Sequence, residues 1–153
     1  IYRKGFTHGG GFHADEVLST ALLKIIDKNF EVERQIFRTD PIPTNEDILV
    51  FDIGRGKYDH HMNVGEGLFD GDHKHAACGL VLRDFYKEMG IDKETYEKLK
   101  NGLIREVEDV DNGVEGTKSL YSNIVSSFIP SETELSGLSE DEKIQFNNER
   151  FFW

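Results

Sequence analysis

The sequence has little cysteine, a shortage of basic residues and no long hydrophobic run, and each shortage excludes a class of protein. Cys78 is the lone cysteine in 153 residues, which excludes an intrachain disulfide framework and is compatible with a reducing compartment. No apolar run approaches the roughly 20 residues that a membrane-spanning helix needs. We therefore expect a cytoplasmic protein with no membrane partner.

The shortage of basic residues restricts the possible partners further. Lysine and arginine total 18 against 29 aspartates and glutamates, which gives a formal net charge of −11 at pH 7. A protein that binds extended duplex nucleic acid through its charge is normally basic, so we do not expect such a partner. An acidic chain can still hold divalent cations, because bound ions change the local charge.

The length and the hydrophobic content are those of one domain. A chain of 153 residues is a typical domain size, and hydrophobic residues make up 37% of it, with 11 phenylalanines. We therefore expect residues 1–153 to form a single domain with a packed core.

The first half of the chain shows the patterns of an α/β fold. Strands are predicted at residues 1–7, 30–37 and 48–51, and apolar residues at helical spacing predict a helix over residues 14–26. The apolar run at 48–51 ends at Asp52 and is typical of a central parallel strand that is buried on both faces. Strand–helix–strand order predicts a mostly parallel sheet with flanking helices and right-handed crossovers.

The second half is predicted to be helical. Apolar spacing and cap residues predict helices at 76–89, 93–110 and 120–129, and a last amphipathic stretch that begins at Ser139. Cys78 lies on an apolar helix face and is expected to be a small core residue.

The first segment that carries chemistry is the histidine- and glycine-rich stretch at residues 7–16. It lies at the carboxyl end of the first predicted strand, where ligands bind in open α/β sheets. Three consecutive glycines let the backbone turn sharply, so that His8, His13 and Asp15 can converge. Imidazole and carboxylate ligands suit Mn, Fe or Zn better than Ca. The glycine run lacks the Lys-Ser/Thr of a phosphate-binding P-loop, so that motif is not expected.

Two further segments add carboxylates and imidazoles. Asp52 ends a buried strand at the same sheet edge and is followed by Asp59, His60 and His61, while Asp111 lies at a helix end. Such a set of residues is typical of a two-metal hydrolase. In these enzymes the ions lower the pKa of a bridging water and stabilise the attacking and leaving oxygens of the in-line displacement at phosphorus.

Each of these features also has a simpler interpretation. Asp52 could be a helix N-cap or a turn residue, and Asp111 could belong to a turn alone. His73 and His75 are expected to be solvated loop residues. Three segments with metal-type ligands, each at the end of a predicted element, are hard to obtain by chance. This favours a metal site over the simpler interpretations.

The motifs resemble known metal-dependent hydrolases. Asp59-His60-His61 after a strand-end aspartate resembles the DHH phosphoesterase superfamily, which includes RecJ-type exonucleases and family II inorganic pyrophosphatases. Residues 7–16 resemble the opening signature of the melanocyte-proliferating-gene family, described as DHH-like 3′–5′ RNA exonucleases. The resemblance implies a DHH-type α/β domain. It also implies a second, substrate-binding domain, which the segment after Pro130 is too short to supply.

The resemblance implies a role for each site residue. The implied metal ligands, with Asp52 bridging two ions, are His8, His13, Asp15, Asp52, His60 and Asp111. Asp59 would orient an imidazole, and His61 would face the substrate phosphate, to stabilise charge or donate a proton. Arg55 and Lys57 are near enough in sequence to help hold a phosphate. The implied cofactor is two divalent cations, with Mn²⁺ as first choice and Mg²⁺, Zn²⁺ or Co²⁺ as alternatives.

The sequence therefore predicts a metal-dependent phosphoester hydrolase, a nuclease or phosphodiesterase that acts on short RNA or nucleotides through a two-metal-activated water. A short substrate fits the acidic composition, because few phosphates need to be neutralised by protein. Two alternatives stay open: a pyrophosphatase or small-nucleotide phosphatase, and a metal-binding regulatory module without turnover.

Overall fold

The structure, a computed structural model, describes residues 2–61 and 67–153 and has the predicted α/β arrangement. The first half contains β1 (Lys4–Thr7), α1 (Ala14–Ile26), β2 (Val32–Arg34) and β3 (Ile48–Val50). The second half begins with a short hairpin, β4 (Phe69–Asp70) and β5 (His73–Lys74), which the sequence patterns did not predict. The helices that follow are α2 (Ala77–Phe85), α3 (Lys93–Leu99), α4 (Arg105–Asp111), α5 (Leu120–Ser126), α6 (Glu132–Leu135) and α7 (Glu140–Phe151).

The central strand of the three-stranded parallel sheet is β1, in the order β2–β1–β3. Gly5 pairs with Val32 on one side and with Leu49 on the other. The prediction that β3 is central was therefore wrong. Within the described residues, the outer edge of β3 is met by a single bridge between Phe51 and Tyr58. Leu49 and Phe51 are nevertheless fully buried, which explains the continuous apolar run.

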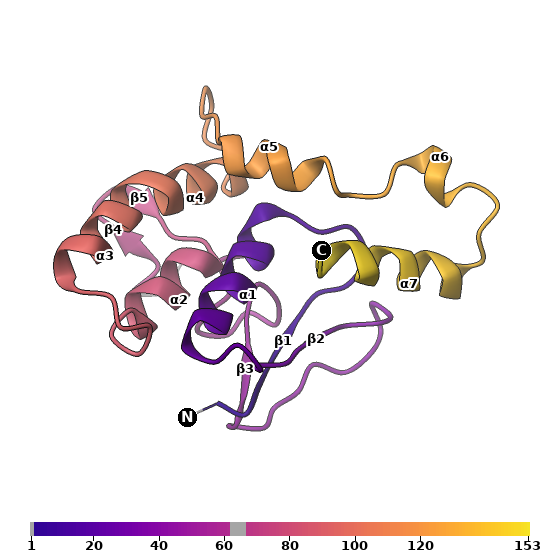
Figure 1. Cartoon of the computed structure of the whole chain (residues 1–153), viewed down its shortest axis with the longest axis horizontal. Helices are drawn as coiled ribbons and strands as arrows, with labels where there is room; N and C mark the ends of the chain where they lie inside the picture. Colours follow the sequence, from indigo (N-terminus) through magenta and orange to yellow (C-terminus); the bar gives the residue numbers. More distant parts are fainter. Residues whose placement is uncertain (1, 62–66) are drawn as a thin grey trace.

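Helix α1 covers the core between the sheet and α2. Its apolar side chains Leu18, Leu22 and Leu23 are buried in the same cluster as Leu49 and Phe51. It connects β1 to the parallel strand β2, as the strand–helix–strand pattern predicts. Figure 1 shows α1 in front of the sheet with α2 beside it, and this packing places the first residues of both helices near the carboxyl end of β1.

The predicted helix at 93–110 is broken. Gly102, at φ −107° and ψ −105°, interrupts it within a π-helical turn (η1, Lys100–Ile104) that separates α3 from α4. Glycine tolerates this backbone conformation, which other residues rarely adopt. The break lets α4 change direction, and its last turn reaches the sheet edge with Asp111.

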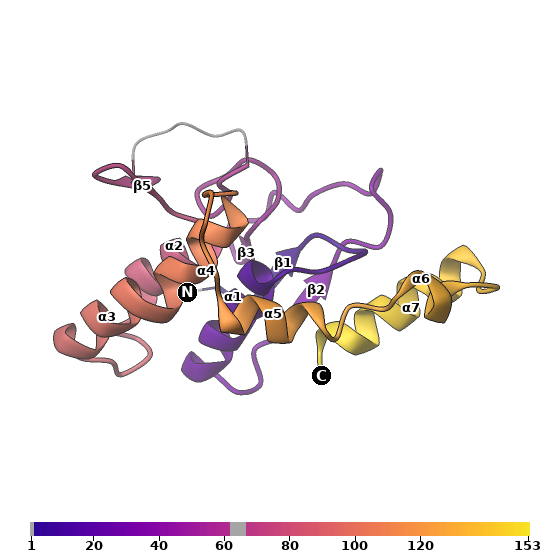
Figure 2. The same ribbon diagram turned by 90° about the horizontal axis from the view of Figure 1, so that it is seen from above.

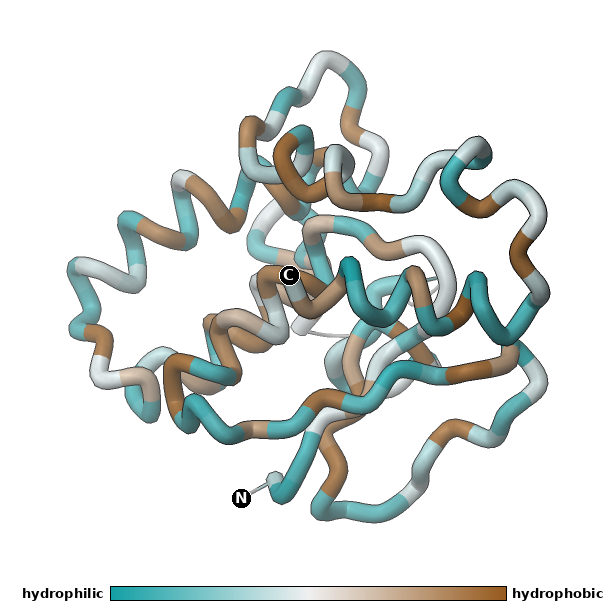
Figure 3. The backbone as a smooth tube through the Cα atoms, turned by 45° about the vertical axis from the view of Figure 1, so that its right-hand side comes forward, coloured by the Kyte–Doolittle hydropathy of each residue, from teal (hydrophilic) through white to brown (hydrophobic). Residues whose placement is uncertain are grey.

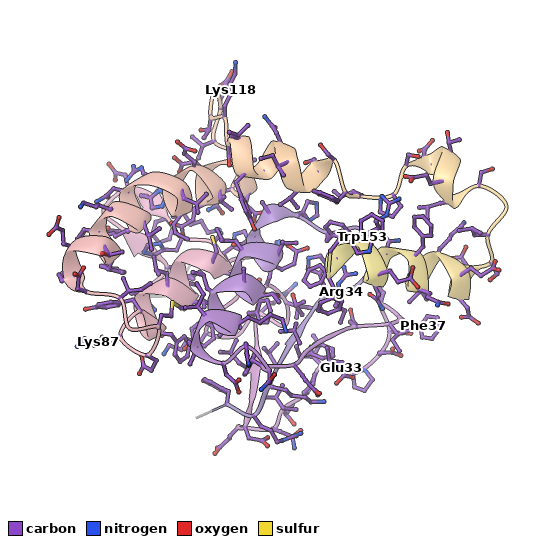
Figure 4. The ribbon with its side chains drawn as sticks, in the orientation of Figure 1. Glu33, Arg34, Phe37, Lys87, Lys118 and Trp153 are labelled. Atoms are coloured by element: carbon purple, nitrogen blue, oxygen red, sulfur yellow. The ribbon has the colours of Figure 1, made fainter. Side chains whose placement is uncertain are left out.

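The C-terminal helix α7 packs against the end of β2. Arg34 stacks on the ring of Phe151 and donates a hydrogen bond of 2.9 Å from Nη1 to Oδ1 of Asn148, while Phe12 meets Phe151 edge to face. Figures 1 and 2 both place α6 and α7 at the opposite end of the molecule from α3. Figure 4 labels Arg34 beside α7, and Figure 3 shows that α7 is mainly hydrophilic, with isolated apolar positions. The attachment of α7 therefore depends on a few aromatic and cation–π contacts.

Two expectations from composition can be compared with the structure. No helix in the described ranges has both the length and the apolarity that crossing a bilayer requires. Cys78 is fully buried in α2, as predicted for a core residue, and this burial raises the pKa of its thiol.

Candidate metal centre

Asp52 lies at the middle of the candidate site, directly after β3. Its backbone is in the left-handed region, with φ 55°, so the chain turns sharply as the strand ends. Its Oδ2 is 3.4 Å from Nε2 of His8, and its Oδ1 is 3.3 Å from Nε2 of His60. The two oxygens of one carboxylate thus face two different imidazoles.

The first group of ligands around Asp52 comes from the loop after β1 and the start of α1. Glu16 Oε1 is 3.0 Å from Nε2 of His8, accepts the backbone N–H of His13 at 2.7 Å and lies 4.0 Å from Nδ1 of His13. Glu16 was not among the predicted ligands. The one signal in the sequence was its place three residues after the N-cap residue His13, where glutamate is a common capping residue.

Asp15, which the sequence predicted beside His8 and His13, does not join the group that those histidines form with Glu16 and faces His60 instead. Successive residues on a helix point about 100° apart, which directs Asp15 and its neighbour Glu16 to different sides of the site. Asp15 accepts the backbone N–H groups of Ala77 and Cys78, at 2.9 and 2.7 Å, where α2 begins. Its Oδ2 also lies 3.7 Å from Nε2 of His60 and therefore belongs to the other side of the site.

The second group brings residues together that are far apart in sequence. Nε2 of His60 is 2.8 Å from Oδ2 of Asp111, at the end of α4. Asp52, His60, His61 and Asp111 each offer one donor atom, and these atoms lie within 4.8 Å of one another. The structure thus brings together His60, Asp52 and Asp111, as the sequence predicted.

Asp59 orients His61. Its Oδ1 accepts hydrogen bonds from Nδ1 and from the backbone N–H of His61, at 2.7 and 3.0 Å, and its Oδ2 accepts the backbone N–H of Arg55 at 2.6 Å. The hydrogen bond to Asp59 raises the pKa of His61. Asp59 therefore holds one side of the His61 ring. The side chain as a whole is still 55% exposed to solvent.

The imidazoles that face Asp52 carry strongly shifted pKa values. Burial alone would lower the pKa of His8, but its hydrogen bonds with Asp52 and Glu16 outweigh burial and raise it to about 11. Burial is likewise outweighed at His60, where close contacts of Nε2 with the carboxylates of Asp111 and Asp52 raise the pKa to about 11. Without bound cations, the protons on these rings therefore balance the neighbouring carboxylates.

The pKa values of the carboxylates in the site are shifted in opposite directions. Burial, and then the charges of Asp52 and Asp111, raise the pKa of Asp15 well above its ordinary value, and burial likewise raises the pKa of Glu16. At Asp52 burial would raise the pKa, but the close contacts with His60 and His8 overcome burial and lower it. Crowded, buried carboxylates of this kind favour the binding of a positive charge.

Three buried atoms of the site fit the ligands of a divalent cation. Asp52 Oδ1, Glu16 Oε2 and His60 Nε2 are buried, and among the described residues none of their contacts has the geometry of a hydrogen bond. Leaving such an atom unsatisfied costs about 1–3 kcal/mol, so each favours a partner that protein groups do not provide. The mixed imidazole and carboxylate set suits Mn, Fe or Zn. The chemistry of the donors therefore fits the divalent cations that the sequence predicted.

Comparison with known proteins identifies the family. The family model for MYG1 exonuclease, described as an uncharacterised protein family (UPF0160), matches residues 5–150. The chain belongs to the MYG1 family. The predicted resemblance to the melanocyte-proliferating-gene family is thereby confirmed, while the wider DHH superfamily stays a prediction.

The MYG1 relatives are longer than this chain. It is 35% identical over 147 residues to a MYG1 protein of Chlamydia pneumoniae, covering 88% of this chain and 47% of the relative. It is 30% identical over 126 residues to a MYG1 protein of Dictyostelium discoideum, covering 71% and 38%. With the MYG1 exonuclease of Bos taurus, the identity is 32% over 133 residues, covering 71% and 34%. The chain thus spans less than half the length of these relatives, and no solved structure matches it.

Asn112 fixes the orientation of His60 in this MYG1 chain, a role that the sequence did not predict. Its side-chain Nδ2 donates to the carbonyl oxygens of Lys74 and His75, at 2.9 and 3.3 Å, so its Oδ1 faces Nδ1 of His60 at 2.9 Å. An amide oxygen can only accept, so Nδ1 of His60 must be the donor. When the ring is neutral, the lone pair of Nε2 is directed at the carboxylates, where a bound cation would lie.

We predict that Asn112→Leu raises the Mn²⁺ concentration for half-maximal binding about 10–100-fold, because His60 loses the partner that sets its tautomer. Isothermal titration with Mn²⁺ measures this, beside thermal unfolding of the metal-free protein. Asn123→Leu, on the exposed face of α5, is the matched control and should bind Mn²⁺ normally. Unchanged Mn²⁺ affinity in folded Asn112→Leu would contradict the role of Asn112.

A pocket of about 930 Å³ opens beside the candidate metal centre. Its lining includes His8, His13, Asp52, His61 and Asp111. Arg38 is the one lysine or arginine among the described residues that line it. Arg55 and Lys57, which we expected near a phosphate, do not line it, and Nζ of Lys57 is 2.6 Å from Oδ2 of Asp84.

His73 and His75 lie outside this centre, and the expectation that they are solvated was wrong. They are only 8% and 5% exposed, and both contact the carboxylate of Glu108. The hairpin β4–β5, which contains His73 and ends just before His75, brings both side chains to Glu108 of α4. Strands of two residues are too short to show a hydrophobic periodicity, so the sequence pattern could not predict this position.

Proposed function

We propose that the chain is a metal-dependent phosphodiester hydrolase of the nuclease type, a single DHH-type domain that acts on short RNA or nucleotides. The observation that carries the proposal is Asp52, whose two oxygens face His8 and His60 at the edge of the pocket. The names of relatives support it, because the bovine and human family members are called MYG1 exonuclease. The lone, buried Cys78 supports a reducing compartment such as the cytoplasm.

We assign the binding of two divalent cations, Mn²⁺ first, to two groups that share Asp52. One group comprises His8, His13 and Glu16, and the other comprises His60, Asp111 and Asp15. Bound cations supply Lewis-acid chemistry at a phosphoryl group, lowering the pKa of a water molecule and neutralising developing charge.

His61 is assigned to the substrate. Asp59 holds its Nδ1, which leaves Nε2 as the atom that can carry a proton to or from a phosphoester oxygen. The raised pKa of His61 favours its protonated form, which suits a proton donor to the leaving oxygen.

Arg38 is assigned to a substrate phosphate. It lines the pocket, is exposed, and has no ion-pair partner in the part of the chain that the structure describes. A guanidinium presents paired donors that match the oxygens of a phosphate. We predict that Arg38→Ala raises KM about tenfold with little change in kcat, because a charge-assisted hydrogen bond contributes about 1.5–3 kcal/mol.

Steady-state kinetics on an oligoribonucleotide with Mn²⁺ measures this effect. Lys57→Ala is the matched control, because it removes a cation that contacts Asp84 outside the pocket. An equal rise in KM for both variants would show that only the overall charge matters, and would remove Arg38 from the site.

The proposed function is tested by a substrate panel with Mn²⁺: RNA oligomers, dinucleotides, pyrophosphate and a generic phosphodiester. We expect hydrolysis of short RNA or dinucleotides, and none after chelation. Turnover of pyrophosphate alone would favour the pyrophosphatase alternative. Mn²⁺ binding without any hydrolysis would favour a regulatory metal-binding module.

A further inference from the structure

A second set of metal-type ligands lies outside the candidate metal centre, where the hairpin β4–β5 meets α4. His73, His75 and Glu108 each offer one donor atom, and these atoms lie within 4.8 Å of one another. All three residues are buried, and Glu108 is only 1% exposed. A buried carboxylate and two buried imidazoles need partners, because burial penalises unpaired polar groups.

Glu108 is the middle of this set. Its Oε1 is 2.9 Å from Nε2 of His73, and its Oε2 is 2.9 Å from Nδ1 of His75. Oε2 also accepts the backbone N–H of Ala76 at 2.7 Å. A side chain at Gly79 would collide with this carboxylate, so α2 leaves room for it. The position of Glu108 is therefore built into the packing of α2 against α4.

The other nitrogen of His73 gives a second, independent observation. Its Nδ1 is 3.0 Å from Oδ1 of Asp109. Metal-bound histidines commonly donate the second ring N–H to a carboxylate, which fixes the tautomer and directs the remaining lone pair at the ion. A neutral imidazole carries one N–H, so His73 can donate to Glu108 or to Asp109 but not to both. A divalent cation with two neutral imidazoles balances the two carboxylates.

We propose that His73, His75 and Glu108 bind a Zn²⁺ ion through three protein ligands, with Asp109 orienting His73. Two imidazoles and one glutamate are an established donor set for zinc, and imidazole nitrogen favours it over Mg²⁺ or Mn²⁺. The ion fastens β5 to the last turn of α4, next to Asp111. Because the backbone of His75 also accepts a hydrogen bond from Asn112, the ion stiffens the support of His60.

The test counts zinc ions per chain. Metal-free protein is loaded with Zn²⁺, desalted, and measured by inductively coupled plasma mass spectrometry. We expect His75→Gln and Glu108→Gln to retain one Zn²⁺ fewer than the wild-type chain. Lys74→Gln, between the two histidines, is the matched control and should retain the wild-type number. Circular dichroism verifies the fold, and Glu108→Gln keeps the shape of the side chain if His75→Gln does not fold.

The visible absorption of Co²⁺ provides a second readout. Asp52→Asn, which alters only the candidate metal centre, should keep the absorption that Glu108→Gln loses. This makes the result independent of the proposed hydrolase activity. Equal zinc counts and equal Co²⁺ spectra in wild-type, His75→Gln and Glu108→Gln proteins would overturn the proposal and leave a hydrogen-bonded histidine–carboxylate cluster.

Discussion

Asp52→Asn is expected to lower Mn²⁺-dependent hydrolysis by about 10³-fold, because it removes the charge that faces both groups of ligands. Asparagine keeps the size of the side chain and tolerates the left-handed backbone of Asp52, at φ 55°. Alanine at this position would add backbone strain to the loss of charge, so asparagine isolates the electrostatic effect.

The measurement combines rate with cation-induced stabilisation. Wild-type protein should gain thermal stability when Mn²⁺ is added, because a ligand that binds only the native state shifts the unfolding equilibrium. Asp52→Asn should lose most of that gain while remaining folded. Asp47→Asn, an exposed carboxylate paired with Arg3, is the control and should behave as wild type. If Asp52→Asn kept both the activity and the Mn²⁺-induced shift, the proposed centre would have to be abandoned.

Gly9→Ala is expected to destabilise the fold by about 3 kcal/mol or more, because overpacking against a rigid neighbour forces the backbone to move. A Cβ atom at Gly9 would lie far inside van der Waals contact of the backbone oxygen of Gln35. Gln35 follows β2, and its N–H donates to the carbonyl of Thr7 at 2.8 Å. The substitution therefore separates β1 from β2 just where His8 leaves the sheet.

The three adjacent glycines form their own control series. Gly10 has φ 71° and nothing within 4 Å of an added Cβ, so Gly10→Ala should cost only about 1 kcal/mol. Gly11 has neither a positive φ nor a neighbour within 4 Å of an added Cβ, and Gly11→Ala should change stability by less than about 0.5 kcal/mol. Denaturant unfolding measures all three. Equal effects across the series would show that the close approach of Gly9 to Gln35 is not limiting.

The sequence could predict those site residues that lie at the end of a strand or a helix. Asp52 follows a run of apolar residues, and Asp111 ends a helix before a glycine, so pattern alone places both at boundaries. Parallel strands bring their carboxyl ends to one edge, and this explains why His8 and Asp52 meet.

The remaining features depend on contacts that have no local pattern. Asp15 and Glu16 are adjacent acids, and only the packing of α1 against α2 decides that one meets Ala77 and the other meets His8. Glu108 is more than thirty residues from the two histidines that it contacts. A continuous apolar run shows that a strand is buried, but not where the strand lies in the sheet. It therefore could not show that β3 is an outer strand beside β1, with Tyr58 bridged to Phe51 on the side away from β1.

The centrality of β1 has a consequence for the order of folding during synthesis. The sheet uses only residues up to Val50, so β1, β2 and β3 can pair before α4 has left the ribosome, where chains emerge at about 5–20 residues per second. Asp52 and His8 precede Asp111 and Asn112 in the chain, so the first pair can be in place while α4 is still inside the ribosome. The second group of proposed ligands is therefore complete only once α4 docks against the sheet, so cation binding by that group would report the docking of α4 and not the pairing of the strands.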